Sequence, residues 1–160
     1  MSAPKLLAAF AAAALLSACA SEPETAVATG TGNASASSGA IRVGSQEDLR
    51  ANVGDRVFFG SDRSNIGADQ RPVLERQARW LAQHAQNQVT VEGHADERGT
   101  REYNLALGQR RANAARDVLV ASGVAGSRVQ TVSFGKDRPE ALSSDETSWS
   151  QNRRAVTVVR

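Results

Sequence analysis

The middle of the chain places an aspartate in a charged loop and an arginine in the helical segment that follows. Asp96 lies beside Glu97 and Arg98, and Arg111 comes about three turns into the segment with helical spacing. A carboxylate binds an ammonium group, and a planar guanidinium binds a carboxylate through two parallel hydrogen bonds. If the loop folds back over the helix, the pair complements the head group of an amino acid, which carries both charges.

The same residues also admit a purely structural interpretation. Asp96 can pair with Arg98, Arg110 or Arg111 inside the protein and so hold the loop in place. Hydrophobic periodicity does not separate an internal ion pair from a ligand site. Both interpretations therefore remain open at the level of the residues alone.

A strand and a helix must position these groups. Val89 and Val91 alternate with polar neighbours at the period of two typical of a half-buried strand, which Gly93 ends. A helix is predicted over residues 101–121, because the Thr100 hydroxyl can cap its first turn and Gly123 supplies a stop. The charged loop then lies at a junction between strand and helix, next to free backbone donors.

The predicted helix carries its apolar residues on one side. The core-facing stripe is expected at Leu105, Ala112 and Leu119. Leu107 falls on the same side as Arg111, since residues four apart share a face. Gly108 costs about 1 kcal/mol relative to alanine in a helix interior. A close backbone approach and a neutral, tolerated glycine both account for it.

The remaining segments alternate between strand and helix patterns. Pro72 belongs in a first helical turn, which places a helix start near Asp69, and Trp80 is expected in the core. The expected elements are strands at 56–59, 89–94, 128–134 and 155–159, helices at 69–85 and 101–121, and a short helix within 143–152. This βαβαβ(α)β order predicts an α/β fold, a two-layer sandwich with helices packed on a mixed four-stranded sheet.

Composition narrows the classes of function. The chain has 160 residues, 41% hydrophobic content and a net charge of +2, which fits one domain with an appendage. No basic block interleaves with aromatic residues, so no nucleic-acid surface is predicted. His94 and Asp96 give too few ligands for a catalytic zinc, and no serine sits in a nucleophile-elbow context. We therefore expect no metal, no cofactor and no enzymatic activity.

The N-terminus reads as an export signal followed by a linker. Residues 1–18 combine Lys5 with a short apolar run, and Cys19, the single cysteine, comes directly after them. Residues 16–19 resemble the bacterial lipoprotein box, which implies cleavage before Cys19 and its acylation. Residues 19–46 are rich in Ala, Ser, Thr and Gly and are interpreted as a lipid-anchored flexible tether. The folded domain is expected at 47–160.

Several separated motifs resemble one family. They are VEGHADERGT at residues 91–100 and the segments 102–104, 107–112, 133–139 and 150–156. In this order they resemble the OmpA-like C-terminal domain family and, within it, the peptidoglycan-associated lipoproteins. The match covers roughly residues 55–160. One departure is Arg101, which stands where the family usually has proline.

The resemblance implies an outer-membrane lipoprotein that binds peptidoglycan non-covalently through the diaminopimelate of its stem peptide. By position, Asp96 and Arg111 match the residues that grip the ammonium and the carboxylate of that amino acid. Further ligand contacts are implied at Asp62, Arg98, Gly99, Thr100 and Leu107. Arg153 and Arg154 are interpreted as structural, bracing the 96–100 loop.

The implied partners are peptidoglycan, the outer membrane reached through the lipid on Cys19, and the Tol system with its periplasmic propeller protein. The domain then faces the periplasm and takes part in envelope constriction during cell division. The alternative is an outer-membrane adaptor or assembly lipoprotein that uses the same domain for protein contacts only.

Overall fold

The computed structural model describes residues 41–160. The predicted signal peptide, Cys19 and the tether up to residue 40 lie outside the described residues. The strands are β1 (Arg56–Phe58), β2 (Val89–His94), β3 (Val129–Gly135) and β4 (Arg154–Val159). The helices are α1 (Gln46–Asp48), α2 (Arg71–Gln83), α3 (Arg101–Ala121) and α4 (Glu146–Asn152), with short helical turns η1 (Leu49–Val53) and η2 (Gly126–Arg128).

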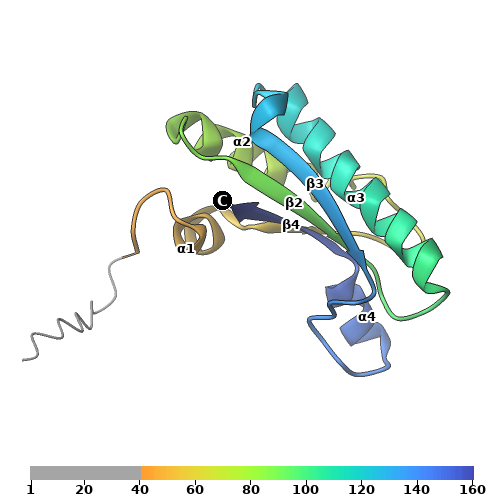
Figure 1. Cartoon of the computed structure of the whole chain (residues 1–160). Helices are drawn as coiled ribbons and strands as arrows, with labels where there is room; N and C mark the ends of the chain where they lie inside the picture. The colour runs from red at the N-terminus through yellow and green to blue at the C-terminus, as the bar shows by residue number, and fades with distance from the viewer. Residues whose placement is uncertain (1–40) are drawn as a thin grey trace, which may run out of the picture. The chain divides into compact units, whose positions relative to one another are not determined.

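The four strands form one mixed sheet in the order β1-β4-β2-β3. β2 runs parallel to β3, and β4 runs antiparallel to both β1 and β2. β4 is therefore interior, as its nearly continuous apolar sequence predicts. Helices α2 and α3 lie over one face of the sheet, while α1 and α4 lie near its opposite ends (Figure 1). The predicted two-layer fold with a mixed four-stranded sheet is confirmed.

The core lies between the sheet and helices α2 and α3. Val89 and Val91 of β2 are fully buried, and Leu81 of α2 and Leu119 of α3 meet them from the helical layer. Trp80 is buried as predicted, and its indole Nε1 donates to the carboxylate of Asp48 at 3.0 Å. The apolar alternation of β2 thus directs one face of the strand into this core.

Helix α3 approaches the sheet through a pair of glycines. A Cβ added to Gly93 would lie 1.8 Å from the carbonyl oxygen of Gly108, and one added to Gly108 would lie 2.4 Å from the Ser133 Oγ. Close approach of the backbones is therefore the reason for the glycine inside the helix. Of the two explanations left open by the sequence, the first is correct.

The buried face of α3 differs from the predicted stripe at one position. Ala112 and Leu119 are buried as expected, but the Leu105 side chain is 40% exposed. The close contact at Gly108 centres the buried face on Leu107, Gly108, Arg111, Ala112, Ala115 and Leu119. Leu105 lies on the flank of that face, so its prediction as a core residue is wrong.

The boundaries of α3 are those predicted. The Thr100 hydroxyl accepts a hydrogen bond from the backbone N–H of Tyr103 at 3.2 Å, and Gly123 has a positive φ of 98° after the last turn. Helix α2 starts at Arg71 rather than near Asp69, because the N–H of Gln70 closes a turn onto the Gly67 carbonyl at 3.0 Å. Pro72 still falls in the first turn, as expected.

The folded part begins earlier than residue 47. The Gln46 side chain donates to the Thr157 carbonyl at 3.2 Å and accepts from the Val159 N–H at 2.7 Å. β1 pairs only with the first half of β4, so the amide of Gln46 takes the place that a longer strand would fill. Asn87 also donates to the Gly44 carbonyl at 2.8 Å. Residues 44–46, predicted as the end of the tether, therefore belong to the domain.

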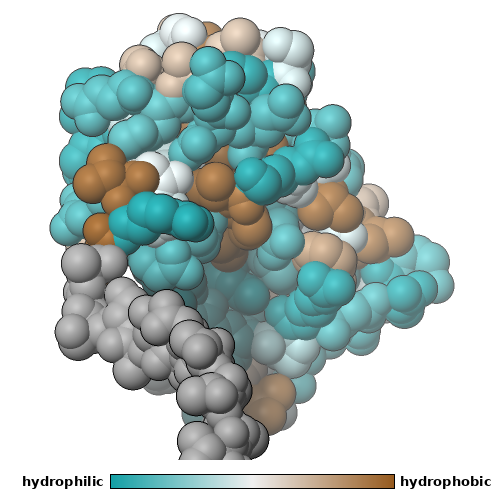
Figure 2. All heavy atoms as spheres, turned by 60° about the vertical axis from the view of Figure 1, so that its left-hand side comes forward, coloured by the Kyte–Doolittle hydropathy of each residue, from teal (hydrophilic) through white to brown (hydrophobic). Residues whose placement is uncertain are grey.

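A cavity of about 810 Å³ lies beside this N-terminal segment, between residues 42–47 and 83–87. The face on which the described chain begins is largely hydrophilic, with apolar side chains in separate patches (Figure 2). No helix within residues 41–160 has the length and apolar character needed to cross a bilayer. The predicted ligand residues lie elsewhere, around the loop that follows β2.

Candidate ligand-binding site

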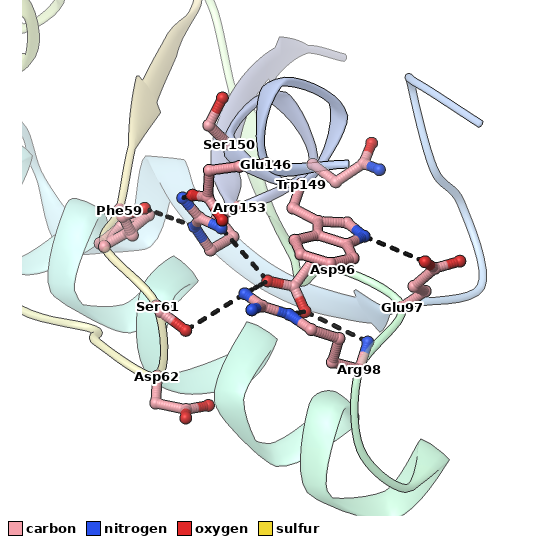
Figure 3. A network of polar contacts seen from close by, with 12 residues as sticks. Phe59, Ser61, Asp62, Asp96, Glu97, Arg98, Glu146, Trp149, Ser150 and Arg153 are labelled. Carbon is pink, nitrogen blue, oxygen red and sulfur yellow. Dashed lines mark hydrogen bonds and ion pairs between the residues drawn. The ribbon is translucent and has the colours of Figure 1, made fainter. Parts of the chain in front are cut away.

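Three segments that are distant in sequence meet where β2 ends. The loop 95–100 leads from β2 into α3, residues 59–63 follow β1, and α4 precedes β4 (Figure 3). The backbone N–H of Ala95 donates to the Gly135 carbonyl at 2.8 Å, which ties the loop to the end of β3. Sheet order therefore brings the ends of all four strands toward one group of polar side chains.

Asp96 is the central acceptor of this group. Its buried carboxylate accepts from Arg98 three times: from the backbone N–H at 3.2 Å, from Nε at 3.2 Å and from NH2 at 2.6 Å. Arg153 adds a contact from NH1 at 3.4 Å. Burial raises the pKa of Asp96, but the hydrogen bonds from Arg98 outweigh burial and bring the pKa below its ordinary value. Asp96 is thus ionised at neutral pH.

Arg98 bridges the loop to the other two segments. Its side chain is 42% exposed, and its guanidinium lies 4.2 Å from the centre of the Trp149 ring. It also donates to the Ser61 hydroxyl at 3.2 Å. The Trp149 indole in turn donates to the Glu97 carboxylate at 3.0 Å. These contacts hold the Arg98 guanidinium at the mouth of the site, over α4.

Arg153 braces the loop from inside, as the sequence predicted. It is buried, and its Nε donates to the Phe59 carbonyl at 3.1 Å while NH2 pairs with Glu146 at 2.6 Å. Its guanidinium also contacts Asp96. Arg153 therefore ties residues 59–63, α4 and the loop to one another.

Arg111 differs from its expected position facing the ligand. It is fully buried, and it donates to the carbonyls of Arg63 at 2.8 Å, His94 at 2.8 Å and Gly60 at 3.0 Å. Burial lowers its pKa to about 10, so the guanidinium stays charged at neutral pH. Within residues 41–160 it makes no ion pair with a carboxylate. Arg111 lies beneath the site and fixes the backbone on both sides of it.

A pocket of about 250 Å³ opens beside Asp96. Its lining residues are Ser61, Asp62, Asp96, Arg98, Gly99 and Tyr103. Four of these, Asp62, Asp96, Arg98 and Gly99, are among the predicted ligand residues, and the structure brings them together in one pocket. Leu107 is buried below, and the Thr100 hydroxyl is used as the cap of α3.

Ser61 and Tyr103 were not anticipated as pocket residues. The Tyr103 hydroxyl lies 3.4 Å from the Asp62 carboxylate, across the pocket mouth. Asp62 has a φ of 52°, a left-handed conformation that aspartate tolerates better than most residues. Tyr103 comes three residues after the cap of α3, so its place in the first turn was the signal that it lies beside Gly99. Ser61 carries no comparable local signal.

Arg101 stands where the family usually has proline, and it forms an ion pair at the start of α3. Its NH2 lies 2.7 Å from the Asp137 carboxylate, so a side chain anchors the first turn of the helix. Within residues 41–160, no three His, Cys, Asp or Glu side chains gather as a metal site would require.

Comparison with known proteins places this geometry among relatives. The model of the OmpA family matches residues 58–153. A "Peptidoglycan-associated lipoprotein" of Rhizobium meliloti is 54% identical over 147 residues, which cover 90% of this chain and 81% of that protein. One from Mesorhizobium japonicum is 60% identical over 121 residues, or 76% of this chain and 72% of that protein. The crystal structure of the peptidoglycan-associated lipoprotein from Burkholderia pseudomallei is 40% identical, with a TM-score of 0.66 over 71% of this chain and 100% of that one.

Proposed function

This chain belongs to the OmpA family, with peptidoglycan-associated lipoproteins as its relatives, and on that premise we propose that it binds peptidoglycan through the diaminopimelate of the stem peptide. One observation carries the proposal. The pocket holds a buried, ionised carboxylate, Asp96, directly beside a half-exposed guanidinium, Arg98. An amino acid head group presents the two complementary charges at a similar spacing.

Four residues of the pocket, Asp62, Asp96, Arg98 and Gly99, contact the ligand in this proposal. Asp96 binds the ammonium group, and the carboxylate is bound on the side of Arg98 and Gly99. Thr100 caps the 21-residue helix α3, whose N-terminus favours an anion. Asp62 adds a polar contact from the opposite wall. Arg111 supports binding from below, by holding the carbonyls of Gly60, Arg63 and His94 and by adding positive charge under the pocket.

The remainder of the proposal concerns the whole chain. We infer that acylated Cys19 anchors the protein in the outer membrane and that the tether spans the gap to the cell wall. An unconstrained chain of this length has an r.m.s. span on the order of 30 Å. Binding to the periplasmic propeller protein of the Tol system, through a surface that overlaps the pocket, belongs to the same proposal. No cofactor and no catalytic step are needed for this role.

Sedimentation with purified peptidoglycan tests the proposal. Asp96→Asn should abolish cosedimentation, because a binding partner of the ammonium is lost, at a cost of about 2–5 kcal/mol. Asp137→Asn is the matched control, since it makes the same change at an exposed aspartate that pairs with Arg101. Circular dichroism checks that both variants fold. Cosedimentation of folded Asp96→Asn at the wild-type level would contradict the proposal.

One observation favours the alternative of an adaptor that makes protein contacts only. Asp96 is already paired with Arg98 and Arg153, as a purely structural carboxylate would be. If the protein is an adaptor, the wild type and both variants would all remain in the supernatant while the peptidoglycan sediments. The same experiment therefore separates the two functions.

A further inference from the structure

The carboxylate that should receive the ligand is occupied by the protein itself. Two side-chain nitrogens of Arg98 lie 3.2 Å and 2.6 Å from the oxygens of Asp96. A ligand ammonium needs the positions that Arg98 takes, because each oxygen already accepts a second bond, Oδ1 from the Arg98 backbone N–H and Oδ2 from Arg153 (Figure 3). Binding therefore requires that the Arg98 side chain leave Asp96.

The surroundings of Arg98 allow that movement. Its side chain is 42% exposed, and among residues 41–160 its guanidinium contacts, besides Asp96, the Ser61 hydroxyl and the Trp149 ring. Asp96 would keep its bonds from the Arg98 backbone N–H and from Arg153, both of which lie on the fixed frame of the site. The backbone of the loop stays in place while the side chain moves.

We propose that Arg98 is the specificity-determining residue of this pocket: it occupies Asp96 in the free protein, is displaced by the ligand ammonium, and then pairs with the ligand carboxylate. The inference rests on the proposed function and adds its selectivity. A ligand with only an ammonium would leave the Arg98 guanidinium without a carboxylate. A ligand with both charges restores each pair that it breaks.

The charges around the pocket support an exchange without net change. Asp62, Asp96, Glu97 and Glu146 carry four negative charges, and Arg98, Arg111, Lys136 and Arg153 carry four positive ones. A zwitterionic head group keeps this balance, whereas a lone cation adds a positive charge next to three guanidiniums. Like charges placed together disfavour the wrong partner. The pocket should thus prefer diaminopimelate to lysine at the same position of a stem peptide, because lysine lacks the second carboxylate.

Calorimetric titration with two synthetic stem peptides tests the inference. One peptide carries meso-diaminopimelate at its third position and the other carries lysine. We expect the wild type to bind the diaminopimelate peptide at least about tenfold more tightly, a difference of about 1.4 kcal/mol. Arg98→Gln should bind the lysine peptide several-fold more tightly than the wild type does, since the internal competitor is gone. The preference should then fall to within about threefold.

Arg101→Gln is the control variant, because it removes the same charge from an exposed arginine that pairs with Asp137 instead. Its preference should equal that of the wild type. An Arg98→Gln protein that loses affinity for both peptides by the same factor would overturn the inference and leave Arg98 as a simple anchor. An unchanged preference would overturn it as well.

Fluorescence of Trp149 gives a second measurement. The Arg98 guanidinium lies over this ring in the free protein, so its departure should change the tryptophan emission when the diaminopimelate peptide binds. The change should be absent in Trp149→Phe and in Arg98→Gln. Tight binding with no change in emission contradicts the exchange but leaves the proposed function standing. Failure of both peptides to bind the wild type would contradict the proposed function itself.

Discussion

His94 is a buried histidine at the end of β2, with its Nε2 3.7 Å from a carboxylate oxygen of Glu92. Its side chain is 2% exposed, its ring centre lies 5.6 Å from that of Phe134, and neither ring nitrogen has a hydrogen-bond partner within residues 41–160. Burial lowers its pKa to about 3, and the positive charges of Arg154 and Arg138 add to this effect. The ring is therefore neutral whenever the protein is folded near neutral pH.

This histidine should make stability depend on pH. In the unfolded chain its pKa is about 6.5. Between that value and about 3 the unfolded state binds the additional proton, so the free energy of unfolding falls as the pH falls. From pH 7.5 to pH 5 we expect a loss of about 2 kcal/mol.

Urea unfolding at the two pH values measures the effect. His94→Gln should lose correspondingly less stability over that interval than the wild type. Parallel losses in the two proteins would show that other groups cause the pH dependence.

At the scale of single residues, the sequence predicted the members of the site that are local to the loop. Asp96, Arg98 and Gly99 lie within a few positions of a recognisable helix start, so pattern alone places them together. The burial of Arg111 was not predictable, because it depends on carbonyls of residues 60 and 63, which only the tertiary fold brings over α3. The pairing of the Arg98 side chain with Asp96 was not predictable either, because Trp149 of α4, which packs on the Arg98 guanidinium, is distant in sequence.

The crossing of α3 over β2 sets the position of the site among the secondary-structure elements. Gly93 and Gly108 let the two backbones meet, and Arg111 lies one turn further along the same helix face. A larger separation of helix and strand would carry the Arg111 guanidinium away from the carbonyl of His94. The glycine pair therefore fixes the support of the pocket as well as the core.

Gly93→Ala should be strongly destabilising, by about 3 kcal/mol, because a Cβ at this position has no room. Its Cβ would meet backbone atoms of Gly108, which cannot rotate away. Gly126→Ala is the control, since its Cβ would meet the flexible tip of Arg116 at 3.3 Å and the Val120 side chain at an ordinary contact distance of 3.9 Å.

Thermal unfolding followed by circular dichroism compares the two variants. The control should stay within about 0.5 kcal/mol of the wild type. Equal stability of the two variants would mean that the sheet and helix separate at little cost.

Most elements could be read from local signals. The N-cap at Thr100 and the glycine at residue 123 predicted where α3 begins and ends. The boundaries of the four strands were predicted to within one or two residues. Local signals did not reveal Leu105 on the flank of α3, because the centre of the buried face depends on where the glycines touch β2. They also missed Gln46, whose polar side chain resembles a linker residue until β4 provides its partners.

At the scale of the whole molecule, residues 44–48 join the domain to the segment that we propose as a tether. Gln46 continues the hydrogen bonding of β4 where β1 stops, and Gly44 is bound by Asn87. Asp48 accepts from the Gly44 N–H at 2.8 Å and from Trp80. This segment closes the end of the sheet opposite the pocket.

Removal of residues 1–46 should cost stability that removal of residues 1–40 does not. The shorter protein loses the hydrogen bonds of the Gln46 side chain and those of Gly44, each worth about 1 kcal/mol, so we expect a difference of about 2–4 kcal/mol. Guanidinium unfolding of the two truncated proteins measures it. Identical unfolding midpoints for the two truncated proteins would mean that residues 44–46 are part of the linker and do not stabilise the domain.

The arrangement of β1, β4 and β2 also has a mechanical consequence. Residues 41–55 lead into β1 at its N-terminal end, β2 leads to the pocket at its C-terminal end, and both run antiparallel to β4 between them. In the proposed function, tension between the anchored N-terminal segment and a bound wall would therefore pull β1 and β2 lengthwise in opposite directions. In such shear loading the cross-strand bonds resist simultaneously rather than opening one by one as in a zipper. Rupture under load would then be limited by the rate of unfolding, which suits a protein that must hold under sustained tension.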